Sequence, residues 1–555
     1  MRQRTARRRF LASAGASAAA AAAWLAVGCD SSSGVPDGGP PRATPVAGQP
    51  DILNPAAPPR RGGRFIQANA AAFGTFDPHR GVAVASAYFP RMYNVLINQS
   101  ATKPDFVFLD LAESYEVPDD TTFIFQVRPG VRIAPNPLGI PERDMDAEDV
   151  QATMERLRTD PSTNNFAFAG KHIERVAVAA STVRIEMPGP YAWFINRIGL
   201  FTNTIPPREL LAGNLDRLNT QGAGGGAYVL QSVAEEDRAI FTRNPNYYRR
   251  DDANGGAQLP YIEEIEVRVV YDKTTQLTAF RSGQTHQYMT GSASEVRALA
   301  DYPVSRDPAF AYIAFTMNHE RPPFGDPRVR RAISRAINRQ QFVDLVYDGE
   351  AQANGLVQWS LGDYALPPDE LEQLQPYDLD EARRLVQEVG GVRFTMMYPA
   401  NTPVLEHDKH LPVFVNQMRQ AGIIVDEDPQ DFGRWVENLR NVEYQCTLNL
   451  NQIYETPEIP LAMHTADGPF GDGTFLRGLG DPEIEAAVAA TTRDYDVDER
   501  VRLVREAQRV IYAKDPVTLA LVTPYQHLVW QHSVKNIPAG IGTSSYLVNT
   551  MWMDV

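Results

Sequence analysis

The residues that could carry out catalysis do not form a common enzyme motif. The serines include no Gly-x-Ser-x-Gly turn, which would present an activated nucleophile. His319-Glu320 is followed by Arg-Pro-Pro, so no second histidine lies one helical turn away to complete a zinc protease site. Carboxylates are plentiful, but the sequence does not show which two meet in space, as acid–base catalysis requires. We therefore expect a protein that is not an enzyme.

Two further clusters could bind phosphate or metal. Gly222 to Gly226 is glycine-rich, but no Lys-Ser/Thr follows, so we interpret it as a loop whose backbone approaches something closely, or simply as a tight turn. His407 and His410 could share a helix face and hold a metal. Prolines at 403 and 412 argue against a long helix there, which favours a chance surface cluster. We expect no metal and no cofactor.

Composition limits the possible partners and the number of cores. The formal charge of −15 argues against a nucleic-acid partner, because neutralising phosphates needs a surplus of Lys and Arg. With 43% hydrophobic and 22% charged residues, the chain has the composition of a globular protein. Its 555 residues exceed what one hydrophobic core usually holds, so we expect two or three lobes in a monomer.

The first 28 residues have the pattern of an export signal. Five arginines precede an uncharged, alanine-rich stretch that ends at Cys29. Arg7-Arg8-Arg9-Phe10-Leu11 resembles a twin-arginine motif, and Leu25-Ala26-Val27-Gly28-Cys29 resembles a lipoprotein cleavage site, which implies lipidation of Cys29. A retained transmembrane anchor is the alternative, and the general secretory route also stays open. We expect an extracytoplasmic, lipid-anchored protein in which residues 29–63, rich in Pro, Gly and Ser, form a tether.

From Arg64 onward, helices and strands intermix. Residues 122–128 and 264–271 alternate as half-buried strands do, with inward side chains at Phe123, Phe125, Val127, Ile265, Val267, Val269 and Tyr271. Helices are expected after capping residues at Asp146, Asp326, Asp378, Asp481 and Asp498. The pattern predicts a mixed α/β chain.

Several separated segments resemble family 5 of the bacterial extracytoplasmic solute-binding proteins. The similarity is collinear from Arg64 to the C-terminus. The motifs that carry it are Phe76-Asp77-Pro78-His79, Phe123-Ile124-Phe125-Gln126-Val127-Arg128-Pro129-Gly130, Asp146-Ala147-Glu148-Asp149-Val150, Gly225-Gly226-Ala227-Tyr228, Asn244-Pro245-Asn246-Tyr247 and Asp326-Pro327-Arg328-Val329-Arg330-Arg331-Ala332-Ile333. The resemblance implies a receptor that captures a solute and delivers it to the permease of an ABC importer.

This resemblance also implies a layout of α/β lobes around a hinged cleft, the large type II form of a periplasmic binding protein. By analogy, lobe I takes residues 64–100, 218–302 and 525–555, an extra subdomain takes 101–217, and lobe II takes 303–524. Solute binding would shift an open–closed equilibrium that the permease detects.

The solute is less well determined than the layout. In peptide-binding relatives a carboxylate in lobe II meets the ammonium of the peptide, but Ile453 stands at the corresponding position, with Glu455 as a possible substitute. Residues 283–286 read Gly-Gln-Thr-His where the family has Gly-Glu-x-Asp. A buried ammonium without a carboxylate would be costly, which disfavours a peptide with a free N-terminus.

We therefore predict a mixed polar and aromatic cleft for a peptide-like or other medium-sized organic solute. Its predicted lining is Thr75, Phe76, Gly225, Gly226, Trp359, Tyr398, Asn401, Asn451, Tyr454 and Glu455, although core packing is the alternative for each aromatic side chain. Two other functions remain open, an exported hydrolase and a ligand-sensing or chaperone-like lipoprotein with the same fold.

Overall fold

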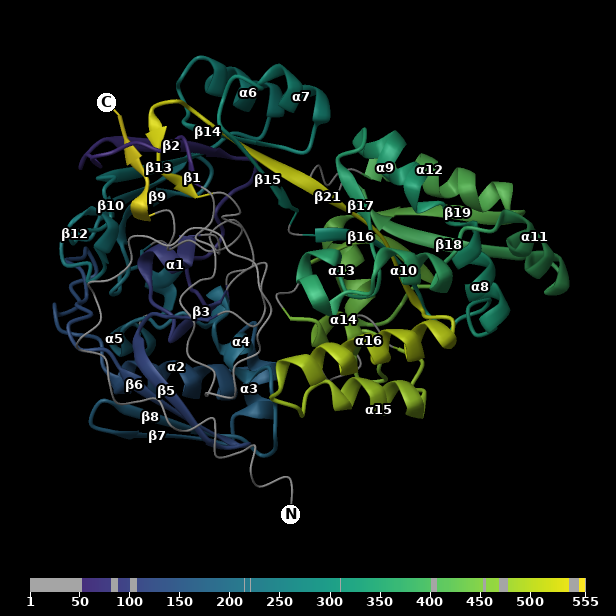
Figure 1. Cartoon of the computed structure of the whole chain (residues 1–555), viewed down its shortest axis with the longest axis horizontal. Helices are drawn as coiled ribbons and strands as arrows, with labels where there is room; N and C mark the ends of the chain where they lie inside the picture. The colour runs from purple at the N-terminus through teal and green to yellow at the C-terminus, as the bar shows by residue number, and fades with distance from the viewer. Residues whose placement is uncertain are drawn as a thin grey trace, which may run out of the picture.

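The computed structural model of the chain describes residues 52–80, 88–99, 107–213, 215–219, 221–309, 311–400, 407–452, 456–468, 478–538 and 549–554. Two lobes lie side by side in Figure 1, and the long strand β21 (Thr518–Trp530) runs from one to the other. Helices α8 to α16 belong to one lobe, and α1 to α7 belong to the other. We call the lobe with α1 lobe I and the lobe with α8 lobe II.

One mixed sheet continues through both lobes. Its lobe II part has the order β19 (Ile423–Gln430), β18 (Val392–Pro399), β20 (Cys446–Gln452), β16 (Ala311–Met317) and β21. Its lobe I part continues with β14 (Gln287–Thr290), β2 (Arg64–Asn69), β13 (Glu264–Val269), β10 (Arg238–Arg243) and β9 (Tyr228–Ala234). Two more strands, β15 (Val304–Pro308) and β17 (Ala351–Ala353), pair with β21.

Lobe I is completed by short helices and two-stranded pairs. Helix α1 (Phe89–Met92) packs on the sheet, and α6 (Lys273–Arg281) and α7 (Ala293–Ala298) flank β14. The short pairs are β1 (Ile52–Leu53) with β23 (Ile537–Pro538), β3 (Ile97–Gln99) with β4 (Val107–Leu109), β11 (Arg250–Asp251) with β12 (Ala257–Gln258), and β22 (Val534–Lys535) with β24 (Trp552–Met553).

A separate antiparallel sheet forms the subdomain attached to lobe I. Its order is β5 (Ala112–Asp119), β6 (Thr122–Val127), β8 (Thr182–Glu186) and β7 (Arg175–Ala179). The helices of the subdomain are α2 (Ala147–Thr159), α3 (Phe166–His172), α4 (Phe194–Ile198) and α5 (Arg208–Leu211). Phe123 and Phe125 are fully buried and Val127 is nearly so, which confirms the inward face predicted for this strand.

Some helices of lobe II pack on its sheet, and others pack in the core that includes the subdomain. The helices of lobe II are α8 (Pro327–Ala336), α9 (Arg339–Tyr347), α10 (Pro368–Leu374), α11 (Leu379–Glu388), α12 (His407–Gln420), α13 (Phe432–Arg440), α14 (Glu458–Ala462), α15 (Pro482–Ala490) and α16 (Val497–Ala513). The predicted caps at Asp326, Asp378 and Asp481 are confirmed, because each side chain accepts hydrogen bonds from the first turn of its helix.

Three local predictions were wrong. The cap of α16 is Asp496, whose side chain accepts a hydrogen bond from the Glu499 amide, rather than Asp498. Helix α12 continues through Pro412, which near the N-terminus of the helix forfeits one backbone hydrogen bond. Tyr271 lies beyond the end of β13 and is 57% exposed, so the alternation does not extend to it.

Residues 52–62 belong to the folded part rather than to the tether that composition predicts for residues 29–63. Ile52 and Leu53 pair with Pro538 and Ile537. The Asn54 side-chain amide donates to the Val534 carbonyl at 2.6 Å, and the Gly62 amide donates to the Tyr261 carbonyl at 2.9 Å. Within the described ranges, no helix combines the length and apolar character that crossing a membrane requires.

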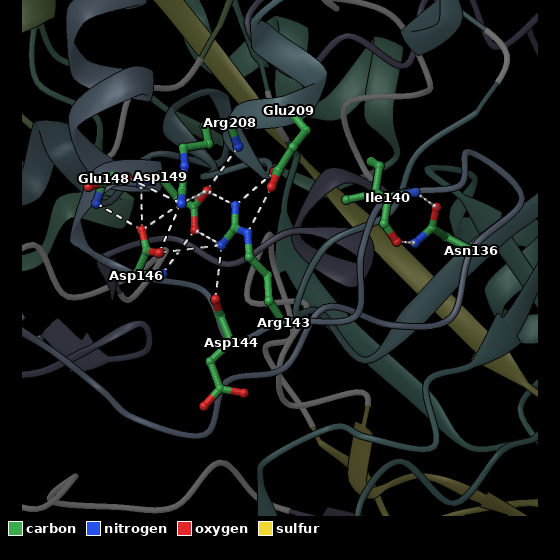
Figure 2. A network of polar contacts seen from close by, with 9 residues as sticks. All are labelled: Asn136, Ile140, Arg143, Asp144, Asp146, Glu148, Asp149, Arg208 and Glu209. Atoms are coloured by element: carbon green, nitrogen blue, oxygen red, sulfur yellow. Dashed lines mark hydrogen bonds and ion pairs between the residues drawn. The ribbon is translucent and has the colours of Figure 1, made fainter.

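A buried carboxylate joins two helices of the subdomain. Asp149 is fully buried in α2 and accepts two hydrogen bonds from the Arg143 guanidinium, at 2.6 and 2.8 Å (Figure 2). Arg143 also holds Glu209 in α5, and the Arg208 amide donates to Asp149 at 2.9 Å. Asp149 and Asp146 form the reciprocal capping box of α2, which confirms the predicted start of this helix. The cluster fixes the N-terminus of α2 against α5.

Candidate ligand-binding site at the junction of the lobes

Strand β21 changes its partners at the point where it passes between the lobes. Its first half pairs with β16 and β17 in lobe II, and its second half pairs with β14 and β15 in lobe I. The change falls at Pro524 and Tyr525, because Ala351 faces Pro524 whereas Pro308 faces Tyr525. Segments where few residues connect two lobes are the places at which hinge motion is absorbed.

Aromatic and charged side chains surround this junction. The Arg306 guanidinium lies 3.5 Å from the centre of the Tyr525 ring, and the Trp359 ring lies 5.3 Å from it. The Tyr525 hydroxyl donates to Gln352 Oε1 at 3.3 Å. Glu350 accepts from Arg306 Nε at 2.9 Å and lies 3.3 Å from His527 Nε2. Both lobes thus contribute residues to one polar and aromatic group.

Several buried polar atoms at this junction lack hydrogen-bond partners among the described residues. They are Trp359 Nε1, Ser360 Oγ, Gln358 Oε1 and Asp307 Oδ2. Buried donors and acceptors are almost always paired in folded proteins, with protein groups, with water or with a bound molecule. A polar solute seated here would supply such partners.

Asp307 carries an ionisable side chain, unlike Trp359, Ser360 and Gln358. Its side chain on β15 is only 6% exposed, and burial raises the pKa of its carboxyl group. None of the described salt bridges involves it. A buried carboxylate without a cation is unfavourable, so an ammonium or guanidinium group of a solute would be stabilised beside it. The sequence analysis missed Asp307, because its strand reads Val-Ser-Arg-Asp-Pro and has no apolar alternation that marks an inward face.

Of the predicted site residues in lobe I, Phe76 packs in the core. Phe76 is fully buried, with its ring 5.9 Å from Phe73 and 6.3 Å from Phe241. Thr75 is half-buried, and its hydroxyl accepts a hydrogen bond from the Asp77 amide at 3.0 Å. The ring of Phe76 is therefore placed for packing rather than for contact with a solute.

Gly225 and Gly226 pack against the end of helix α1. A Cβ atom at Gly225 would lie 2.5 Å from Asn94 Oδ1, and one at Gly226 would lie 2.4 Å from the Met92 carbonyl carbon. The backbone of this loop therefore approaches a neighbour closely, which is one of the two interpretations that the sequence allows. The neighbour that it approaches is the protein itself.

The predicted residues in lobe II are dispersed. Trp359 lies at the junction, as described above. Tyr398 lies on β18, with its hydroxyl donating to Glu427 Oε2 at 3.2 Å, and Asn451 lies on β20 opposite Tyr312. Asn401, Tyr454 and Glu455, like Cys29, lie outside the described residues. Of the ten predicted residues, the structure brings Trp359 to the junction.

His410, one of the two histidines considered as metal ligands, forms a contact between helices instead. His410 is buried in α12 and forms a hydrogen bond through Nε2 with the Tyr347 hydroxyl. Among the described residues, no three His, Cys, Asp or Glu side chains come together as a metal site. His410 therefore joins α12 to α9.

Comparison of the fold places the protein among the two-lobed periplasmic binding proteins. A structure of the ABC transporter-associated periplasmic binding protein DppA from Helicobacter pylori, in complex with the peptide STSA, matches with a TM-score of 0.73 at 19% identity. The match covers 89% of this chain and 99% of that chain. The binding protein MoaA from A. tumefaciens R10, in complex with mannopinic acid, matches with a TM-score of 0.72 at 17% identity and covers 89% of this chain and all of its own.

The chain belongs to the bacterial extracellular solute-binding proteins, family 5, whose middle-region model matches residues 107–471. Among its relatives, di/tripeptide-binding protein 3 of Pseudomonas aeruginosa is 24% identical over 75% of this chain and 81% of that protein. Glutathione-binding protein GsiB of Salmonella paratyphi A is 26% identical over 84% of this chain and 89% of that protein. The resemblance seen in the sequence motifs is confirmed.

Proposed function

We propose that this protein is the substrate-binding receptor of an ABC importer and captures a peptide-like solute between its lobes. The observation that carries the proposal is the family 5 match across residues 107–471 on a fold whose lobes share strand β21. Relatives named for di- and tripeptides and for glutathione support a short peptide as the solute class. Binding energy then shifts the equilibrium between open and closed lobes.

The charge at the junction supports a solute with a cationic group. Ile453 replaces the acidic residue of peptide-binding relatives, so the receptor needs another carboxylate if it takes a free ammonium group. Asp307 is buried and lacks a cation among the described residues, and Glu455 is the second carboxylate that we propose. Trp359 and Tyr525, whose rings lie 5.3 Å apart, supply aromatic surface at the junction. Thr75, Tyr398, Asn401, Asn451 and Tyr454 remain further predicted contacts.

We also propose that the protein acts outside the cytoplasm as a lipid-anchored monomer. The motif Arg7-Arg8-Arg9-Phe10-Leu11 supports twin-arginine export, and Cys29 supports acylation after cleavage of residues 1–28. The chain from Cys29 to Asp51 then separates the membrane from the first described strand. Mass spectrometry of the mature N-terminus tests this part independently of solute binding.

The test of the function is to identify what the purified protein binds. Native mass spectrometry of the folded protein reveals any co-purified solute, and calorimetric titration then compares a dipeptide pool, a tripeptide pool, glutathione and mannopinic acid. We expect at least one peptide arm to bind and to be recovered unchanged. Selective binding of mannopinic acid would contradict the peptide assignment. Cleavage of the solute would instead support the exported hydrolase, and binding without import in a permease-linked uptake assay would support a sensing lipoprotein.

A further inference from the structure

Besides strand β21, which joins lobe I to lobe II, a second contact links the two sides of the molecule. It lies between the subdomain and lobe II, far from β21. Figure 1 shows α3 and α4 of the subdomain beside α15 and α16, at the opposite end of the molecule from β14 and β15. Hydrogen bonds between described residues cross this contact: the Tyr191 hydroxyl donates to Glu458 Oε1 at 2.9 Å, the Ala192 amide to the Thr492 carbonyl at 2.7 Å, and the Tyr495 hydroxyl to the Asp120 carbonyl at 2.9 Å.

Trp193 is the centre of this contact. Its side chain is fully buried, although it precedes the short helix α4 on the rim of the subdomain. The ring lies 5.3 Å from the ring of Tyr364 and 4.7 Å from the Arg500 guanidinium, and Nε1 donates to the Thr491 carbonyl at 2.9 Å. All three partners belong to lobe II. A fully buried tryptophan is the kind of side chain that dominates the energy of an interface.

The subdomain itself is bonded firmly to lobe I. Arg156 in α2 forms a buried, two-bond ion pair with Asp77, at 2.6 and 2.9 Å. Asp110 accepts a hydrogen bond from the Val95 amide at 3.0 Å and forms an ion pair with Arg249 at 3.2 Å. These buried charge pairs are expensive to break, so the subdomain should move with lobe I. Rotation of the lobes about the β21 junction must therefore pull Trp193 out of lobe II.

We propose that Tyr191, Ala192 and Trp193, together with their partners in α14 to α16, form a clasp that holds the receptor closed. The clasp rests on the proposed function, because it presupposes a receptor that opens and closes. It lies away from the junction that we assign to the solute, so it stabilises the closed state whatever solute is present. Weakening it should therefore raise the dissociation constants of all solutes by one common factor and leave selectivity unchanged.

The clasp is tested without any solute, by hydrogen exchange of the Ala192 amide followed by mass spectrometry. Trp193→Phe removes the indole donor to Thr491, and the matched control Trp435→Phe removes an indole donor to Thr447 Oγ1 within lobe II. Tyr191→Phe and Tyr288→Phe form a second pair, because Tyr288 donates to Glu295 within lobe I. Each lost hydrogen bond across the clasp should speed Ala192 exchange about fivefold. The controls should leave it unchanged.

Two results would overturn the clasp. In the first, the Ala192 amide of the wild-type protein exchanges as slowly as the amide of Val183 in the subdomain sheet, which means that the contact opens only when the protein unfolds. In the second, Trp193→Phe speeds exchange of Ala192 and Val183 alike, which means that the substitution loosens the subdomain rather than the contact. Neither outcome depends on which solute binds, so failure of the proposed function is a separate result.

Discussion

At the scale of single residues, Asp307 links stability to solute binding. Its buried carboxyl group has a raised pKa, so its charge opposes folding when the pH rises above that pKa. Asp307→Asn removes the charge and keeps the shape. We expect the solute-free protein to melt at a higher temperature at pH 7 and to bind a cationic peptide at least about thirtyfold more weakly.

Differential scanning fluorimetry measures the first effect and calorimetric titration the second. Asp237→Asn, which removes an exposed lobe I carboxylate paired with Arg238, is the control for the loss of a negative charge. Unchanged affinity in Asp307→Asn would exclude this carboxylate from the site, whatever its effect on melting.

His79 gives a pH dependence with a defined direction. Arg156 Nη1 donates to its Nδ1 at 3.1 Å, so the remaining ring proton sits on Nε2 and is donated to the Thr204 carbonyl at 2.9 Å. Burial, helped by the charge of Arg156, lowers the pKa of His79 to about 4. The unfolded chain therefore binds the proton first, and the free energy of unfolding falls by about 2 to 3 kcal/mol as the pH drops from about 6.5 to about 4.

Urea unfolding between pH 4 and 7 measures this slope. In His79→Gln the free energy of unfolding should fall less over this pH range, by about 2 to 3 kcal/mol, than it does in the wild type. The stability of the variant at pH 7 does not enter this comparison. His172 and His464 also have lowered pKa values, about 4 and about 3, so part of the slope should remain. A slope identical to that of the wild type would show that His79 does not titrate as its surroundings require.

At the scale of elements, the start of helix α2 depends on Arg143. This side chain is 22% exposed and pairs with the fully buried Asp149 as well as with Glu209 (Figure 2). Arg143→Ala should lower the free energy of unfolding by about 3 kcal/mol, because it leaves a buried carboxylate short of its main partner. Arg143→Lys should recover only part of this loss, since lysine cannot form the two-bond pair.

Arg328→Ala is the matched control in urea unfolding, because Arg328 pairs with Asp326 on an exposed surface. Its cost should stay below about 1 kcal/mol. The hydrogen bonds from Arg143 also lower the pKa of Glu209, so this stabilisation is present above the ordinary glutamate pKa and is lost as the pH falls below it. Equal costs for the two substitutions would contradict the special role of Arg143.

Most elements could be predicted from the sequence because their signals are local. A capping aspartate acts within one turn, as Asp146 and Asp481 do, and strand alternation places Phe123 and Phe125 on one face. The errors arose where two local signals compete, as at Asp496 and Asp498, both within reach of the same helix start. They also arose where tertiary packing overrides a local penalty, as at Pro412 in α12.

The candidate site could be predicted only in small part because its residues meet through non-local pairing. Trp359 was found, but its neighbour Tyr525 lies 166 positions away and reaches it through the register of β21. Asp307 acquires its meaning from burial, which its own segment does not reveal. Phe76 and Gly226 carry family motifs, yet they pack against other parts of the chain here. A motif marks a family position and does not show which atoms face a solute.

At the scale of the whole molecule, one strand belongs to the cores of both lobes. Leu519, Leu521 and Val522 of β21 pack in the lobe II core, whereas Trp530 packs in the lobe I core. Lobe II therefore cannot unfold completely without withdrawing a central strand from lobe I. We expect thermal unfolding of the two lobes to occur in one cooperative transition, although a chain of this length often shows more than one.

Leu521→Ala tests this coupling from within lobe II. Leu521 is fully buried, so its truncation should cost about 2 to 5 kcal/mol. Because the strand is shared, the substitution should also speed hydrogen exchange at Val267, in the lobe I strand β13, and shift a single calorimetric peak. Leu385→Ala, in helix α11 of the same lobe II core, is the matched control outside the shared strand. If lobe II melted alone in Leu521→Ala while Val267 kept its protection, the continuous sheet would not couple the lobes, and the junction at Pro524 would behave as a passive linker.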